Sequence, residues 1–203
     1  MKKVLQDYLW LALLAGSIIG ADQYTKYLVR INLAINETWS PWGWLDPYAR
    51  IVHWKNTGAA FGLGQDYGTV FAILSLLVSL AIIYFYPQVP RQDWPLRLAL
   101  GMQMSGALGN LIDRLNYGYV IDFVSLGRFP VFNVADASIS MGVVALLLGV
   151  WIKDRQQKKD ALPLQEDAFG EALMEDSTAP AAAELAEASP APEVDETEET
   201  AHE

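Results

Sequence analysis

The sequence predicts an all-α membrane protein: a four-transmembrane-helix bundle that carries a small extracytoplasmic β-sheet and ends in a disordered acidic C-terminal tail. The chain is 52% hydrophobic over 203 residues, and its apolar residues gather in four runs before residue 159. All 14 Lys and Arg lie at or before Lys159, whereas 14 of the 24 acidic residues follow it. We therefore expect a membrane domain over residues 1–159 and a disordered tail over residues 160–203.

The four apolar runs predict membrane spans at about residues 8–29, 69–86, 95–115 and 136–152. The second is the strongest, because its 18 residues carry no charge and, at about 1.5 Å per residue, cross most of a hydrocarbon core of about 30 Å. The first run also has features of a cleavable signal peptide. However, three further apolar runs follow it and it has no small-residue cleavage site, so we expect a retained span.

Basic residues set the expected orientation. Eight Lys or Arg lie at the N-terminus, between the second and third spans and after the fourth span, against three in the other two loops. The positive-inside rule then predicts cytoplasmic termini and outer loops at residues 31–68 and 116–135. Within these loops, residues 48–54 and 119–123 are rich in β-branched and aromatic residues, which predicts the strands of the outer sheet.

Small residues recur on one face of three predicted spans, which favours close packing of these helices. In the first span they are Ala12, Gly16 and Gly20; in the third, Gly101, Ser105 and Gly109; in the fourth, Ser138, Gly142, Ala145 and Gly149.

Composition excludes several kinds of site. With no Cys, the chain can form neither a disulfide nor a thiolate nucleophile, and two His do not suffice for a His-built zinc site. A Ser nucleophile is a weaker alternative, because His53 is the only His outside the tail and no Ser is spaced to pair with it. The net charge of -10 comes from the tail, since residues 1–159 carry 14 basic and 10 acidic residues. The chemistry is therefore expected to depend on carboxylates.

Four carboxylates lie at the predicted outer ends of helices, where an ionised group is costly and so is a functional candidate. They are Asp22, Asp113, Asp122 and Asp136. Two of them have structural alternatives. Asp22 precedes Lys26 by four residues, so the two can neutralise each other within one helix. Asp113, beside Arg114, is interpreted as the end of a span.

Asp122 and Asp136 form the more informative pair. Asp122 interrupts the apolar residues 118–124, where a charge is costly without a partner. Asn133 and Asp136 match an N-cap followed by an acid in the first helical turn, and capping alone would explain them. A loop of 13 residues separates the two carboxylates, so they can meet. One ionised and one protonated carboxyl group can hydrolyse an amide, with Asp136 as the base and Asp122 as the acid.

Five sequence blocks resemble, in order and spacing, those of the bacterial lipoprotein signal peptidases (signal peptidase II). They are DQYTK at 22–26, NTGAAF at 56–61, GALGNLIDR at 106–114, VIDF at 120–123 and FNVAD at 132–136. The resemblance covers about residues 5–155 and excludes the tail. Ser105 departs from it, since the family usually has Gly there.

The resemblance implies a membrane aspartic endopeptidase that cleaves the signal peptide from prolipoproteins just before a Cys carrying a diacylglyceryl group. It implies no metal or organic cofactor, and its implied partners are lipid-modified prolipoproteins and membrane lipids, with no nucleic acid. The implied location is the bacterial cytoplasmic (inner) membrane, with the active site near the outer face. A site complete in one chain needs no second copy, so we expect a functional monomer.

Site residues are carried over from the resemblance by position. The catalytic dyad falls on Asp122 and Asp136. Residues expected to bind substrate or support the dyad are Asp22, Lys26, Asn56, Gly58, Asn110, Arg114 and Asn133.

Two other classes of protein stay open on the residues alone. A small transporter would use Asp22, Lys26 and Asp113 as an ion path, although the four spans show no inverted repeat. A scaffold would recruit partners through its acidic tail. Deletion of residues 160–203 separates the scaffold from a peptidase, which should keep its activity.

Overall fold

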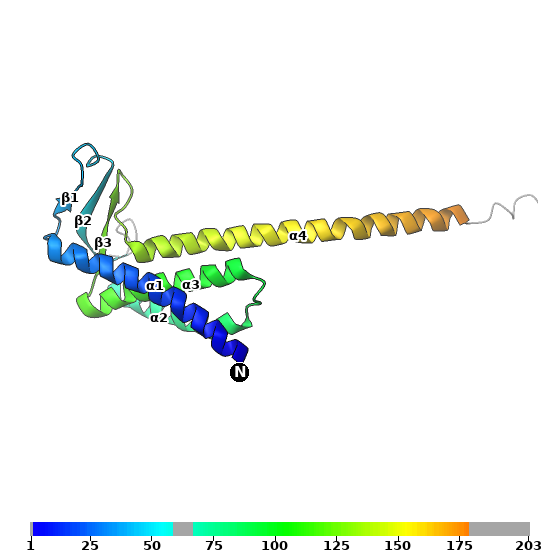
Figure 1. The fold of residues 1–203 in the computed structure, drawn as a ribbon, viewed down its shortest axis with the longest axis horizontal. Helices are drawn as coiled ribbons and strands as arrows, with labels where there is room; N and C mark the ends of the chain where they lie inside the picture. Colours follow the sequence, from blue (N-terminus) through cyan, green and yellow to red (C-terminus); the bar gives the residue numbers. More distant parts are fainter. Residues whose placement is uncertain (1, 59–66, 179–203) are drawn as a thin grey trace, which may run out of the picture. The chain divides into compact units, whose positions relative to one another are not determined.

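The computed structural model describes the backbone of residues 2–58 and 67–178, and the side chains of these ranges up to residue 158. The chain forms two compact units, Met1–Lys153 and Asp154–Glu203. The elements, in chain order, are α1 (Lys2–Asn32), β1 (Thr38–Trp39), β2 (Ala49–Asn56), α2 (Gly68–Phe85), the 3-10 turn η2 (Tyr86–Gln88), α3 (Trp94–Tyr117), β3 (Val120–Leu126) and α4 (Val134–Thr178) (Figure 1).

Three helical segments in the described part of the chain are long and apolar enough to cross a membrane: Lys2–Asn32, Gly68–Gln88 and Val134–Lys158. They match the first, second and fourth predicted spans. The third predicted span is helix α3, whose 24 residues extend about 36 Å, but it does not reach the same apolar character. Its crossing of the membrane stays a prediction.

The position of α3 explains its lower hydrophobicity. Helix α3 packs against both α1 and α2, and its Gly106 approaches Ala135 of α4. Polar side chains of α3 are therefore buried within the protein, among them Ser105, Asn110 and Asp113. A helix enclosed by its neighbours does not need the apolar surface that lipid contact demands.

The sheet is antiparallel, with strand order β1-β2-β3, and lies at the C-terminal end of α1 (Figure 1). Strands β2 and β3 confirm the strands predicted around residues 48–54 and 119–123. Ile121 and Phe123 of β3 pack with Val29 of α1 in an apolar cluster. Because successive side chains of a strand point to opposite faces, Asp122 points away from this cluster. The sheet thus holds Asp122 on the face opposite this cluster, where Asn56 and Asn133 reach its carboxylate.

The predicted small-residue faces hold for α3 and α4 but are wrong for α1. A Cβ added at Gly101 of α3 would lie 2.5 Å from the Leu14 side chain, and one at Gly142 of α4 would lie 3.0 Å from the Ala99 carbonyl oxygen. At Gly16 and Gly20 of α1, an added Cβ would have no atom within 4 Å. These two glycines therefore do not mediate helix packing in this bundle.

Helix α4 continues to Thr178, past residue 152 where the fourth span was expected to end. The prediction of disorder from residue 160 therefore begins too early in the chain. The residues after the span include Lys, Arg and Gln, which favour helix even without a buried face. Lys158 also pairs with Asp154, one turn earlier, at 2.8 Å. Residues 179–203, the remainder of the predicted tail, lie outside the described part.

Gly106 gives a test of the helix packing. We expect Gly106→Ala to destabilise the protein by about 1–3 kcal/mol, the usual effect of overpacking. The added Cβ would lie 2.3 Å from the Ala135 carbonyl oxygen and 2.6 Å from Cγ1 of Ile139, so α3 and α4 would have to separate. The measurement is the unfolding temperature in detergent, followed by Trp fluorescence. Gly20→Ala is the matched control and should not lower this temperature, and equal temperatures for the two variants would contradict the packing.

Candidate active site

Asp122 and Asp136 reach one hydrogen-bond network from different elements, β3 and the first turn of α4. Asn133 connects them. Its Nδ2 donates to Oδ1 of Asp122 at 2.7 Å, and its backbone N–H donates to Oδ2 of Asp136 at 3.2 Å. The structure therefore brings the two predicted carboxylates together around a single residue, Asn133.

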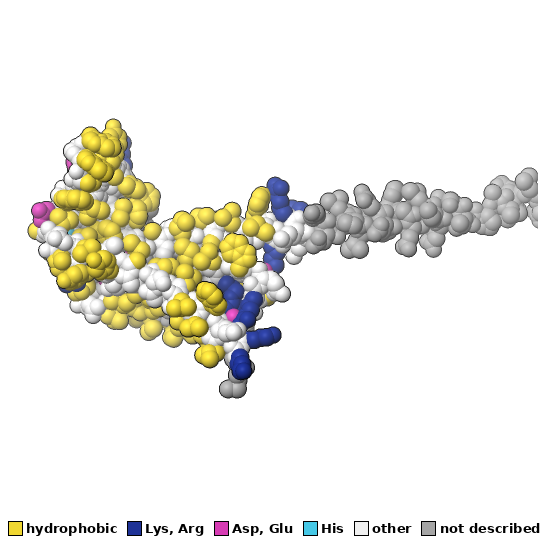
Figure 2. Space-filling model, viewed as in Figure 1, with side chains coloured by type: hydrophobic (Ala, Val, Ile, Leu, Met, Phe, Trp, Pro, Cys, Tyr) yellow, Lys and Arg dark blue, Asp and Glu magenta, His cyan; other side chains and the backbone are white. Residues whose placement is uncertain are grey.

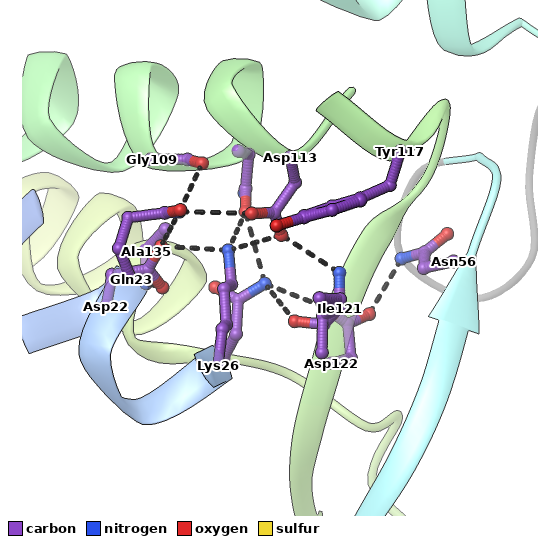
Figure 3. Close-up of polar contacts among 12 residues, drawn as sticks. Asp22, Gln23, Lys26, Asn56, Gly109, Asp113, Tyr117, Ile121, Asp122 and Ala135 are labelled. Atoms are coloured by element: carbon purple, nitrogen blue, oxygen red, sulfur yellow. Dashed lines mark hydrogen bonds and ion pairs between the residues drawn. The ribbon is translucent and has the colours of Figure 1, made fainter. Parts of the chain in front are cut away.

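The second oxygen of Asp122 is held by Asn56, the last residue of β2. Nδ2 of Asn56 donates to Oδ2 of Asp122 at 2.9 Å, and Figure 3 shows this amide pointing from β2 toward the carboxylate. Oδ1 of Asn56 accepts a hydrogen bond from the Gly58 backbone N–H at 3.0 Å. Arg114 donates to the Gly58 carbonyl oxygen at 3.2 Å. The sequence block that begins at Asn56 is thereby linked to α3; its residues 59–61 lie outside the described part.

The second oxygen of Asp136 is held by Asn110 of α3. Nδ2 of Asn110 donates to Oδ1 of Asp136 at 2.8 Å. Oδ1 of Asn110 accepts from the Lys26 ammonium at 3.1 Å and from Nδ2 of Asn133 at 3.1 Å. Each carboxylate of the pair therefore has an amide donor on both oxygens.

The first turn of α4 confirms the capping pattern expected for Asn133 and Asp136. Oδ1 of Asn133 accepts from the Asp136 backbone N–H at 2.8 Å, while the Asp136 carboxylate accepts from the Asn133 N–H. This is a reciprocal capping box. A further free amide of this turn, the Ala135 N–H, donates to Oδ1 of Asp22 at 2.9 Å. Asp136 therefore both caps α4 and belongs to the hydrogen-bond network of the two carboxylates.

A buried ion cluster lies beside the pair. Lys26 contacts Asp22 at 2.8 Å and Asp113 at 2.9 Å, and all three side chains are at most 2% exposed. Asp113 also contacts β3, where the Ile121 backbone N–H donates to its Oδ2 at 3.0 Å. The expected helix pair of Asp22 and Lys26 is confirmed. The interpretation of Asp113 as a span end is wrong, because this residue joins the third helix to the first and to β3 (Figure 3).

Gln23 is a member of this cluster that the sequence did not indicate. Its Nε2 lies within hydrogen-bond distance of Asp22 at 3.1 Å, Asp113 at 3.0 Å and the Gly109 carbonyl oxygen at 3.1 Å. The only available signal was its place within the DQYTK block, next to Asp22. A neutral amide at this point supplies donors without adding charge.

The electrostatics of the site favour a protonated Asp122. Burial, and after it the charge of Asp136, raise the pKa of Asp122 from 3.8 to about 7. Hydrogen bonds from Asn56 and Asn133 and the charge of Lys26 lower the pKa but do not cancel the shift. One carboxyl group of the pair can therefore carry a proton near neutral pH.

A groove of about 300 Å³ opens beside the pair, between α2, α3 and α4. In the part of the chain that the structure describes, Asn110, Arg114 and Asp136 line it but Asp122 does not. Its other walls include Phe71, Leu74, Val78, Ala107 and Ile139. A polar end with Asp136 and an apolar wall suit a ligand that is itself apolar next to its reacting group.

Comparison with known proteins gives consistent matches. A family model described as "Signal peptidase (SPase) II" matches residues 14–152. The lipoprotein signal peptidase of Moorella thermoacetica is 42% identical over 134 residues, which cover 66% of this chain and 87% of that protein. The lipoprotein signal peptidase of Staphylococcus aureus is 31% identical over 152 residues, which cover 73% of this chain and 91% of that protein.

Two solved structures, both described as bacterial membrane enzymes, share the fold. One has a TM-score of 0.65 at 30% identity and covers 71% of this chain and 88% of that chain. The other has a TM-score of 0.61 at 29% identity and covers 69% and 91% respectively. The range matched by the family model, residues 14–152, ends before the acidic tail.

Proposed function

The chain belongs to the signal peptidase II family, and from this premise we propose that Asp122 and Asp136 are the catalytic dyad of an aspartic endopeptidase. Family membership makes the chain a membrane-spanning peptidase of lipoprotein processing. The proposed substrate is a diacylglyceryl-modified prolipoprotein, cut just before its lipidated Cys. The observation that best supports this dyad is the hydrogen-bond network through Asn133, which joins the two carboxyl groups beside a groove.

The first step of the proposed reaction is attack by water. Ionised Asp136, which lines the groove, takes one proton from a water molecule whose oxygen forms a bond to the scissile carbonyl carbon. Protonated Asp122 gives its proton to the carbonyl oxygen, so no oxyanion accumulates. The product of this step is a neutral gem-diol, with the proton now on Asp136 and the charge on Asp122.

The second step is collapse of the gem-diol. Asp136 returns its proton to the amide nitrogen as the C–N bond breaks, and Asp122 takes a proton from one hydroxyl group. The peptide leaves as an amine and a carboxylic acid, and the dyad is back in its first protonation state. No covalent intermediate is formed, which agrees with the absence of Cys and the single His outside the tail.

The supporting residues have distinct proposed roles. Asn56, Asn110 and Asn133 hold the two carboxyl groups in place, and Lys26 with Asp22 holds Asn110 and the first turn of α4. Arg114 lines the groove and donates to the Gly58 carbonyl oxygen, and both residues are proposed to contact the substrate backbone. Fixed donors of this kind reduce the reorganisation needed during reaction.

We also propose that both termini are cytoplasmic and that the dyad lies near the outer face of the bacterial inner membrane, in a functional monomer. The distribution of basic residues supports this orientation. Acyl chains of the substrate would then stay in lipid while the scissile bond reaches the ends of the helices. Exposed Trp39, Trp42 and Trp44 follow α1 on the same side, as expected for residues at headgroup depth.

The direct test is cleavage of a diacylglyceryl-modified prolipoprotein by the purified protein in detergent, followed by a gel shift. The wild type and a variant lacking residues 160–203 should both cleave, and the same prolipoprotein without its lipid is the substrate control. If the folded wild type does not cleave the substrate, the result would favour the alternative of a small transporter. Loss of activity on deletion of the tail would contradict the expectation that residues 1–159 contain the whole peptidase.

The rate should depend on pH through Asp122. Because this group must be protonated to act as the acid, and its pKa is raised to about 7, we expect kcat/KM to fall as pH rises above 7, approaching about tenfold per pH unit. The measurement is kcat/KM for a lipidated peptide between pH 5 and pH 9.

Asn56 provides the control for this pH profile. Its hydrogen bond favours the ionised form and so lowers the pKa of Asp122. Asn56→Ala should therefore move the alkaline limb to higher pH by up to about one unit, the equivalent of one hydrogen bond to a charged group. Asn32→Ala removes an exposed amide that bonds the Leu28 carbonyl and should leave the limb in place. An unshifted limb in Asn56→Ala would argue that another group controls the profile.

A further inference from the structure

A second charged cluster lies near the start of α1, far from the candidate active site. Asp7 precedes Asp22 by 15 residues, or about 22 Å along a helix. Asp7 is 6% exposed, and its Oδ1 accepts from Nε of Arg91 at 2.9 Å and from a terminal nitrogen of Arg97 at 2.7 Å. The proposed reaction uses none of these three residues.

The two arginines of this cluster differ in their surroundings. Arg97 is 10% exposed on its side chain, donates to the Val89 carbonyl at 3.0 Å and lies 4.3 Å from the centre of the Tyr86 ring. Arg91 is 49% exposed on its side chain. One carboxylate faces two guanidinium groups, so the cluster carries surplus positive charge. Since Arg97 is the more buried of the two, the surplus charge is presented to the surroundings by Arg91.

Further positive charge lies around Arg91. Its guanidinium donates to the Lys3 backbone carbonyl at 2.7 Å, which places the Lys2 and Lys3 end of α1 beside it. Figure 2 shows Lys and Arg side chains gathered at this end of the helices, next to apolar surface. Asp93, the acidic residue nearest to Arg91 in sequence, is paired with Lys153 at 2.9 Å.

An apolar groove of about 890 Å³ begins at this cluster. Its volume lies within the range of about 300–1,000 Å³ that is common for ligand sites. Arg91 and Arg97 line one part, and the remaining wall includes Leu9, Leu13 and Leu98. Trp10 and Trp94 also line it and are 69% and 64% exposed, as expected for residues at the level of lipid headgroups.

We propose that this groove binds one anionic phospholipid, with its phosphate against Arg91 and an acyl chain along the leucines of α1. Both terminal nitrogens of the Arg91 guanidinium donate to Oε1 of Gln6 at 3.4 Å, and a phosphate can replace these two long contacts with two parallel hydrogen bonds. The surplus positive charge selects an anionic headgroup. A second copy of the chain is a poorer occupant, because a symmetric contact would bring two positive clusters together. This inference does not depend on the proposed function.

The experiment is native mass spectrometry of the full chain released from detergent, with bound lipids counted at increasing lipid concentration. The probes are phosphatidylglycerol, phosphatidylcholine with the same acyl chains, and glycerol phosphate. We expect the anionic lipid to bind about tenfold more tightly than the zwitterionic lipid, and glycerol phosphate not to compete at matched concentration. Arg91→Gln should weaken the anionic lipid about five- to tenfold, as expected for one basic contact.

Lys153→Gln is the matched control, because it removes one exposed charge that pairs with Asp93 and does not line this groove. It should retain the preference for the anionic lipid. Three results would overturn the proposal. They are equal affinity for the two lipids, an unchanged preference for the anionic lipid in Arg91→Gln, and displacement of the lipid by glycerol phosphate. So would a disulfide-linked dimer of the Trp10→Cys variant that excludes lipid. Unfolding temperatures without added lipid should agree among the variants, which separates loss of binding from loss of fold.

Discussion

Asp122→Asn and Asp136→Asn should each reduce kcat/KM by at least about 10³-fold, as expected for loss of a general acid or base. Asn fills the space of Asp but neither gives nor takes a proton at neutral pH. The two losses should not add in the double variant, because either residue alone stops the same step. The measurement is cleavage of a diacylglyceryl-modified peptide in detergent at pH 6.5.

Folding of these variants must be measured beside their activity. The pKa of Asp122 is raised from 3.8 to about 7 by its burial, so the wild type loses stability as pH rises through this window, and Asp122→Asn does not. At pH 8 the unfolding temperature of Asp122→Asn should therefore equal or exceed that of the wild type. Asp154→Asn, which alters an exposed pair with Lys158, should leave activity unchanged. Substantial activity in either dyad variant would mean that other carboxylates carry the reaction.

Lys26→Met should destabilise the protein by about 3–5 kcal/mol, the usual effect of removing one partner from a buried ion pair. Asp22 and Asp113 are both 0% exposed, and without this ammonium their two buried carboxylates would have no cation between them. Activity should fall as well, because Lys26 also donates to Asn110, which holds Asp136. The measurement is chemical unfolding in detergent, together with kcat/KM.

Two further variants test this explanation of the Lys26 effect. Lys153→Met removes a Lys whose side chain is 58% exposed, and its effect should stay below about 1 kcal/mol. Adding Asp113→Asn to Lys26→Met should recover part of the lost stability, since one uncompensated charge is removed. If the double variant is less stable than Lys26→Met alone, charge is not the cause of the loss.

The sequence indicated the two residues of the proposed dyad through patterns that are local to each of them. Asp122 interrupts an apolar strand, and a charge there needs a partner that only tertiary structure can supply. Asp136 follows Asn133 in a helix-capping pattern, which fixed the start of the fourth helix correctly. Local patterns of this kind are readable because their cause lies within a few residues.

The roles of Asp113 and Gln23 could not be predicted in the same way. Asp113 lies next to an Arg at the end of an apolar run, which is an ordinary place for an acid at a membrane surface. Its partner Lys26 is 87 residues away in sequence, and only the crossing of α1 and α3 brings them together. The same limit applies to Gly16 and Gly20, whose spacing indicated a packing face although none of the residues that the structure describes covers them.

The orientation of the side-chain amide in each of the three asparagines of the site follows from its hydrogen-bond partners. The Gly58 N–H, the Asp136 N–H and the Lys26 ammonium can only donate, so each amide must present its oxygen to one of them and its NH₂ group to a carboxylate. When Asp122 is protonated, its O–H therefore cannot point at Asn56 or Asn133, since donor would meet donor. The proton is left on a lone-pair direction of Asp122 that neither amide occupies. In the proposed reaction, two side chains that do not titrate would therefore determine the direction in which Asp122 gives its proton.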